Sequence, residues 1–286
     1  MGRSYYDIAS IRICIETPND EKFEKFSLFQ CQPFDDADVY ITVKHEPIDM
    51  TDCEPIYKDI AVTWYTHGAD RFACVFNSLG ERRRLVSFFY DKDWSNVTVI
   101  CDQTDLVYYV CGPVGEVIFR NKLIQKGGMV IHASGIDYKG NGIFFSAPAG
   151  TGKTTHSNLW VKHLGARIIN GDRPPILLRD DAIFLCGSPW SGSSPVFENI
   201  TLPLKAMVFL VQAPENSIQE LSKDRALLMM APRCFLPYYD KTAMVRAMDN
   251  IEKIIMSTNC YYLKCRPDSA AMEKVLECIS PTLMNL

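Results

Sequence analysis

The sequence lacks several features that mark membrane, secreted and nucleic-acid-binding proteins. Its 286 residues contain no apolar run of about 18 residues, the length that a membrane-spanning helix needs. The segment Met1–Glu16 has no basic stretch followed by an apolar run and a cleavage site, so no secretory signal is expected. A net charge of −4 gives no electrostatic reason to expect a nucleic-acid partner. The longest basic run is Arg82–Arg84, which we expect in a solvated turn.

Patterns for metal binding and for disulfide frameworks are also missing. The eleven cysteines are odd in number and show no metal-ligand spacing. Cys260 and Cys265 flank an apolar strand pattern, which is typical of reduced thiols in or near a core. Together with the missing signal and membrane segments, these thiols favour a cytoplasmic protein.

The first part of the chain has a β-rich pattern. The composition is globular, with 47% hydrophobic and 22% charged residues. Residues 1–112 alternate apolar and polar positions, and turn residues separate the runs. We therefore expect an antiparallel β-rich N-terminal domain that shapes the substrate or forms a homo-oligomer. Its expected strands are Ile11–Ile15, Val39–Val43, Ile60–Tyr65, Arg71–Phe76, Leu85–Tyr90 and Val97–Ile100.

Residues 113–286 differ, because strand patterns here alternate with helical ones. Short apolar runs predict buried strands, so we expect an α/β nucleotide-binding domain within a protein that is α+β overall. The expected helices are Val114–Gln125, Lys153–Leu164, Asp240–Met256 and Ser269–Ile279. The expected strands are Met129–His132, Gly142–Ser146, Ala166–Ile169, Ile183–Leu185, Ala206–Val211 and Tyr261–Leu263.

The segment Ala147–Thr154, with the sequence APAGTGKT, has the pattern of a phosphate-binding loop. It follows a predicted buried strand and precedes a predicted helix, so its backbone N–H groups converge on one point. We expect Lys153 to contact the β- and γ-phosphates of ATP, and the Thr154 hydroxyl to bind Mg²⁺. The alternative is a Gly-rich turn that only caps the helix. The expected nucleotide contacts are Ala149, Gly150, Thr151, Gly152, Lys153, Thr154 and Thr155.

An acidic residue follows the next predicted strand. Asp172 ends the string Asn170–Asp172, so we expect it at the same edge of the sheet as the loop, where ligands of open α/β sheets bind. There it can hold Mg²⁺ or take a proton from an attacking hydroxyl; the alternative is a capping role in a turn. Its neighbour Arg173 suits either a γ-phosphate contact or a surface salt bridge.

Three further features have competing interpretations. His132 ends the predicted strand before the loop, and a lone histidine is more often structural than catalytic. The pair Asp180 and Asp181 falls between two strand patterns, which favours a hairpin turn. Trp190 lies in an unusual loop and suits either a wall of the site or a plug in the core.

Three strings occur in order at close spacing: Ile131–Gly135 (IHASG), Ser146–Thr155 (SAPAGTGKTT) and Asn170–Asp172 (NGD). This arrangement resembles the HPr serine kinase/phosphorylase family, whose catalytic domain is related to phosphoenolpyruvate carboxykinase. Ser188–Gly192 and Pro203–Lys205 further resemble a bacterial branch of HPr kinase-like proteins. The resemblance covers about Met129 to Leu210, and the C-terminal end more loosely.

The resemblance implies a role for each matching residue. Lys153 and Thr154 become nucleotide and metal contacts, Asp172 becomes the catalytic base, and His132 becomes a member of the catalytic site. Gly171 stands where the family has the first of two adjacent acids, and the Glu-x-Arg-Gly-x-Gly signature is missing. HPr is therefore not the expected acceptor, and the family's downstream arginine has no evident counterpart.

The resulting expectation is an ATP- and Mg²⁺-dependent kinase that phosphorylates a serine-type hydroxyl. The acceptor is a peptide, a small protein or a small molecule. One alternative is a nucleotide-binding regulatory module without turnover. Another is a carboxykinase-like enzyme acting on a small acid, which needs a second metal site of Lys, His and Asp. The five histidines, at positions 45, 67, 132, 156 and 163, form no such cluster in the sequence.

Overall fold

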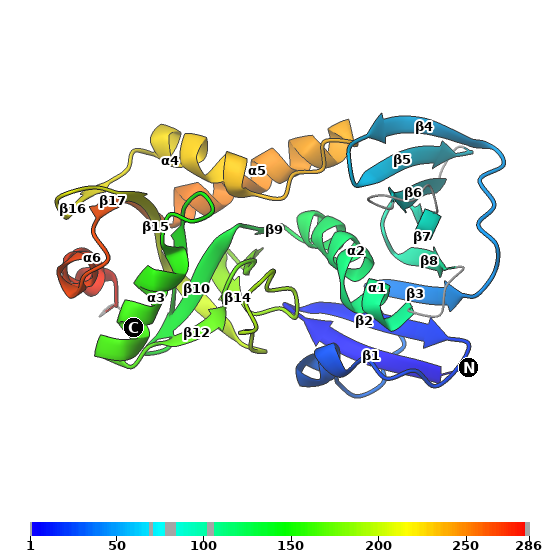
Figure 1. Cartoon of the computed structure of the whole chain (residues 1–286), viewed down its shortest axis with the longest axis horizontal. Coiled ribbons are helices and arrows are strands. Elements are labelled where there is room, and N and C mark those ends of the chain that lie inside the picture. The colour runs from blue at the N-terminus through cyan, green and yellow to red at the C-terminus, as the bar shows by residue number, and fades with distance from the viewer. Residues whose placement is uncertain (1, 69–70, 78–83, 102–105, 284–286) are drawn as a thin grey trace. The chain divides into compact units, whose positions relative to one another are not determined.

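The computed structural model describes residues 2–68, 71–77, 84–101 and 106–283. The chain forms two compact units, Met1–Gln125 with Pro237–Lys241 (unit 1) and Lys126–Leu236 with Thr242–Leu286 (unit 2). Each unit is built on its own β-sheet with accompanying helices, so the protein is a mixed α+β protein (Figure 1). Arg82 and Arg83, expected in a turn, lie outside the described residues.

Unit 1 contains an eight-stranded sheet in the order β1-β2-β3-β8-β7-β6-β5-β4. The six strands expected here are present, and β1 and β4 at the two edges were not foreseen. The strand bounds are β1 Gly2–Ile8, β2 Ile11–Thr17, β3 Val39–Lys44, β4 Cys53–Lys58, β5 Val62–His67, β6 Arg71–Asn77, β7 Arg84–Asp91 and β8 Asn96–Ile100.

The expectation of a purely antiparallel sheet in unit 1 is wrong at two pairings. Strand β3 pairs in parallel with both β2 and β8. The chain leaves β2, passes through the 3₁₀ helix Glu24–Phe29 and returns to begin β3 beside the start of β2, so the two strands run the same way. The remaining pairings are antiparallel.

The units separate after Gln125, one helix later than the boundary expected at Gly112. Helices α1 (Leu106–Cys111) and α2 (Pro113–Gln125) both belong to unit 1. The buried Lys122 of α2 donates hydrogen bonds of 2.9 Å to the carbonyl oxygen of Asp93 and to Ser95 Oγ. These bonds tie α2 to the turn before β8, which explains why the helix clusters with the N-terminal sheet.

Unit 2 contains a nine-stranded sheet whose main path is β12-β10-β11-β15-β14-β13-β9, with β17 beside β15 and β16 beside β17. The strands are β9 Gly128–Val130, β10 Ala133–Tyr138, β11 Asn141–Ser146, β12 Arg167–Asn170, β13 Pro175–Arg179, β14 Ala182–Cys186, β15 Thr201–Gln212, β16 Ser217–Glu220 and β17 Asn259–Cys265. The helices are α3 Lys153–Leu164, α4 Lys223–Met230, the 3₁₀ helix Ala231–Arg233, α5 Lys241–Ser257 and α6 Ser269–Leu283. None of the helices in the described ranges has the length and apolar character needed to cross a bilayer.

Strand β10 was not expected, and it determines which residues meet at the edge of the sheet. It pairs antiparallel with β11 on one side and with β12 on the other. The carboxyl ends of β11 and β12 therefore lie at the same edge as the start of β10. His132 directly precedes β10, so placing it at the end of the preceding strand was wrong: β9 already ends at Val130.

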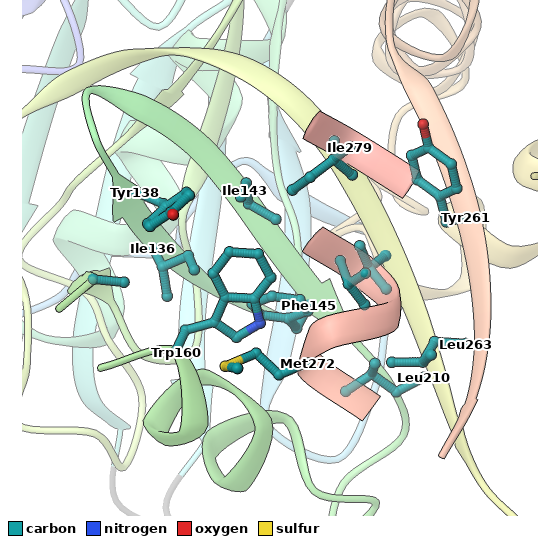
Figure 2. Close-up of a cluster of buried hydrophobic side chains, with 14 of the residues drawn as sticks. Ile136, Tyr138, Ile143, Phe145, Trp160, Leu210, Tyr261, Leu263, Met272 and Ile279 are labelled. Carbon is teal, nitrogen blue, oxygen red and sulfur yellow. The ribbon is translucent and has the colours of Figure 1, made fainter. Parts of the chain in front are cut away.

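An apolar core holds α3 and α6 against this sheet. Trp160 of α3 is fully buried and faces Phe145 of β11 and Met272 of α6 (Figure 2). His156 is buried in the same region, where its ring centroid lies 4.6 Å from that of Phe145. Its Nε2 accepts a hydrogen bond of 3.3 Å from Trp160 Nε1. Burial lowers the pKa of His156 to about 4, so the fold holds this imidazole neutral.

This buried imidazole predicts a loss of stability in acid. The folded-state pKa of His156 is below its ordinary value of 6.5, so its contribution is fully present above pH 6.5 and is lost as the pH falls toward 4. At pH 4 the loss reaches about 3 kcal/mol. Urea unfolding between pH 7 and 4 measures the loss. His156→Gln should remove this part of the pH dependence, and the exposed His163→Gln is the matched control. A His156 titration midpoint near 6.5 by NMR contradicts this account.

Candidate functional site

A glycine-containing loop connects β11 directly to α3. The loop spans Ala147–Gly152, between the end of β11 at Ser146 and the start of α3 at Lys153. Gly150 and Gly152 have φ angles of +76° and +109°, which L side chains rarely adopt. A Cβ at either glycine meets nothing within 4 Å, so the space around the loop is open. Gly152 is the N-cap of α3 and carries no side chain to cap the first N–H groups, which leaves them available to an anion.

Lys153 is the charged residue that this loop buries. Only 8% of it is exposed, and its Nζ donates a 3.2 Å hydrogen bond to the carbonyl oxygen of Ala147. Burial lowers the pKa of Lys153, while the charge of Asp172 opposes that shift. An ammonium group has three donors, and an anion at the loop would use the remaining ones and offset the cost of burial.

The Asp172 carboxylate lies between His132 and Arg173. Its Oδ1 is 3.0 Å from His132 Nε2, and its Oδ2 is 3.3 Å from Arg173 Nε. The backbone contributes to the same junction, because the N–H of Ala133 donates to the carbonyl oxygen of Asp172 over 3.0 Å. The structure therefore brings His132 and Asp172 together at the edge where β10 begins and β12 ends.

The surroundings of His132 favour its neutral form. Burial lowers its pKa first, the positive charge of Lys153 lowers it further, and Asp172 opposes both effects. Because Nε2 lies 3.0 Å from the carboxylate, we assign the proton of the neutral ring to Nε2, which then donates a hydrogen bond to Asp172 Oδ1. The contact is therefore a hydrogen bond that orients the carboxylate without neutralising its charge.

Arg233 completes the charged cluster and was not foreseen. It lies in the segment Pro232–Phe235, which joins the site through a 2.8 Å hydrogen bond from the N–H of His132 to the carbonyl oxygen of Arg233. Its guanidinium donates to the carbonyl oxygen of Met229 and lies 5.7 Å from the Phe209 ring centroid. Its buried Nε has no hydrogen-bond partner among the described residues. The sequence around Arg233 carries no motif, so only the three-dimensional contact could reveal it.

A cavity of about 510 Å³ lies at this edge of the sheet. Two of the expected catalytic residues, His132 and Asp172, line it together with Arg173 and Arg233. Lys153, also expected in the catalytic site, is not among its lining residues. The positive charge gathered here contrasts with the net charge of −4 of the whole chain. The cavity is lined by His132, Ala147, Pro148, Asp172, Arg173, Pro232, Arg233, Cys234 and Phe235.

The other expected nucleotide contacts surround the start of α3. Ala149, Gly150, Thr154 and Thr155 are exposed, which leaves them accessible to a ligand. The half-buried Thr151 accepts a 3.3 Å hydrogen bond at its carbonyl oxygen from Gln212 Nε2, at the carboxyl end of β15.

Two of the open interpretations are settled by the fold. Asp180 and Asp181 have φ angles of 50° and 61° and form the turn between β13 and β14, so the hairpin is confirmed. Trp190 is 3% exposed and is not among the residues lining the cavity, so it fills the interior.

The donor set fits a magnesium ion that arrives with phosphate groups. Among the described residues, no three His, Cys, Asp or Glu side chains gather as a metal site. Magnesium commonly takes one or two protein oxygens and completes its shell with substrate phosphates and water. The exposed Thr154 hydroxyl and the Asp172 carboxylate are oxygen donors of this kind.

Comparison with known proteins gives a weak structural likeness. A scan against protein-family models finds no match, and a search of the curated proteins finds none either. Among solved structures, the chain is similar to the Hpr(Ser) kinase/phosphatase from Coxiella burnetii, with a TM-score of 0.32 and 10% sequence identity. The likeness covers 55% of this chain and 99% of that chain. At this TM-score it does not establish a shared family.

Proposed function

We propose that unit 2 binds ATP with Mg²⁺ and transfers the γ-phosphoryl group to a serine-type hydroxyl. One observation carries this proposal: the glycine-containing loop before α3 lies at the same sheet edge as the Asp172 carboxylate. The loop suits a phosphate chain, because uncapped N–H groups and the buried Lys153 are available there. A carboxylate nearby suits the proton that an attacking hydroxyl must lose.

The positive charges support a polyphosphate ligand. The positive charge of Arg233 lowers the pKa of Lys153, so the two cations lie close enough to interact. Burial lowers the pKa of Arg233 as well, so both cations are held away from water. Such preorganised cations stabilise charge on a transferring phosphoryl group without having to reorganise.

In the proposed reaction, Asp172 accepts the proton of the acceptor hydroxyl. The hydroxyl oxygen forms a bond to the γ-phosphorus, the bond from that phosphorus to the β–γ bridging oxygen breaks, and ADP leaves. His132 keeps the carboxylate oriented and, being neutral, leaves its charge intact. Thr154 and Asp172 would hold the magnesium ion, which would neutralise charge on the β- and γ-phosphates.

The contact between Arg173 and Asp172 favours a second candidate, a nucleotide-binding module without turnover. An arginine that stays 3.3 Å from Oδ2 occupies the oxygen that a substrate hydroxyl needs. In the kinase, a bound phosphate chain draws the Arg173 guanidinium away from the carboxylate.

Replacing Lys153 tests nucleotide binding. Lys153→Ala removes the buried ammonium, and charge-assisted hydrogen bonds of this kind contribute enough that affinity for Mg-ATP falls roughly 10- to 100-fold. Calorimetric titration measures the change, and circular dichroism checks the fold. The exposed Lys162 on the same helix provides the matched control, Lys162→Ala. Unchanged binding by Lys153→Ala would show that the loop does not hold phosphate.

Replacing Asp172 separates a kinase from a passive binder. Asp172→Asn keeps the shape and removes the proton acceptor, so ATP affinity stays within about tenfold while phosphoryl transfer or background ATP hydrolysis falls roughly 10²- to 10⁴-fold. The exposed turn residue Asp181 provides the control variant Asp181→Asn. If the wild type binds ATP yet neither hydrolyses it nor labels a hydroxyl acceptor, the module without turnover is the better description. A fully active Asp172→Asn places the base elsewhere.

A further inference from the structure

We propose that Asn170 is a positioning residue, which sets the orientation of the Asp172 carboxylate from two sides. Its buried amide holds the turn that carries Asp172 and also holds a loop, Ser188–Ser194, that packs against the carboxylate. This inference rests on the proposed function for its effect on turnover. Its effect on the geometry of Asp172 is independent of that function.

The side-chain oxygen of Asn170 stabilises the turn that contains Asp172. Asn170 Oδ1 accepts hydrogen bonds from the backbone N–H groups of Asp172, over 3.1 Å, and of Arg173, over 2.7 Å. An asparagine that bonds to the backbone two residues on fixes a tight turn. Asn170 is the last residue of β12, so the sheet itself determines where this turn begins.

The side-chain nitrogen of Asn170 binds the loop Ser188–Ser194. Asn170 Nδ2 donates to the carbonyl oxygens of Ser188 and Trp190, each over 3.1 Å, and to Ser188 Oγ over 3.2 Å. An amide has two donors and one oxygen with two lone pairs, so these contacts use its full capacity. Asn170 is 0% exposed, and both its amide oxygen and its amide nitrogen form hydrogen bonds. It therefore links the turn rigidly to the loop.

The loop lies directly against the carboxylate. A Cβ on Gly192 would stand 1.9 Å from Asp172 Oδ2, and a Cβ on Gly171 would stand 2.0 Å from Ser194 Oγ. Both distances are far too short for a real contact, so a Cβ at either position would have to displace the Asp172 or the Ser194 side chain. Gly192 also has a φ of +57°. The loop therefore limits the positions open to the carboxylate, which keeps Oδ1 on His132 and Oδ2 toward Arg173.

Asn170 is expected to affect the rate of phosphoryl transfer and not the affinity for the nucleotide. Displacing a catalytic group by about 1 Å costs on the order of 10²-fold in rate. Asn170 does not line the cavity, and the side-chain hydrogen bonds that the described structure gives it go to Asp172, Arg173, Ser188 and Trp190 and not to the loop before α3. Releasing Asp172 from Asn170 or from Gly192 is therefore expected to lower kcat and leave nucleotide affinity nearly unchanged.

Three variants test this inference. Asn170→Asp keeps an acceptor for the turn and replaces the donor that holds the loop. Gly192→Ala leaves Asn170 intact and pushes on the carboxylate from the loop. Gly140→Ala is the matched control, because Gly140 also has a positive φ, of +79°, but a Cβ there meets nothing within 4 Å.

The main readout is spectroscopic and needs no turnover. Imidazole ¹⁵N shifts of His132 report its hydrogen bond to Asp172, so Asn170→Asp and Gly192→Ala should alter them while Gly140→Ala does not. Where the enzyme turns over, kcat should fall on the order of 10²-fold in both variants, with ATP affinity within about threefold by calorimetry. Thermal unfolding confirms that each variant is folded.

Two results would overturn the inference. One is a folded Gly192→Ala with wild-type His132 shifts, since the loop would then not constrain the carboxylate. The other is a fall in kcat of the same size for Gly140→Ala, which would reflect general strain. A wild-type protein that fails to bind ATP rejects the proposed function, and the His132 shifts still decide the role of Asn170.

Discussion

The pairing of β10 between β11 and β12 is the constraint on which the site depends. Backbone hydrogen bonds make β10 antiparallel to both neighbours, so the ends of β11 and β12 and the start of β10 share one edge. That arrangement places the loop before α3, Asp172 and His132 at one edge of the sheet. Arg233 reaches the same edge by bonding to the backbone of His132.

Burying charged groups at this edge costs free energy, and neighbouring charges offset part of that cost. Lys153 and Arg233 are partly removed from water, and their pKa values are lowered by burial. Asp172 offsets some of that cost, with His132 and Arg173 as its partners. A cluster with more positive than negative charge is best stabilised by an anion, which links the electrostatics of the cavity to the proposed phosphate ligand.

Local patterns predicted much of this structure, and long-range pairing accounts for the rest. Helix α3 begins and ends at the expected residues, Lys153 and Leu164, because the glycines of the loop and Gly165 mark its two ends. Strand β10 was missed because its ASGIDY sequence has no strong period, and tertiary pairing decides it. Neither Arg233 nor the contact of Gly192 with Asp172 has a local signal, since both arise from segments that meet only in the fold.

A structure of the protein with Mg²⁺ and a non-hydrolysable ATP analogue would show whether the loop before α3 holds the phosphate groups. We expect the β- and γ-phosphates at the N-terminus of α3, with Lys153 Nζ within hydrogen-bond distance and the γ-phosphate facing the cavity that Asp172 lines. An analogue bound elsewhere, with no phosphate at the start of α3, would contradict this expectation.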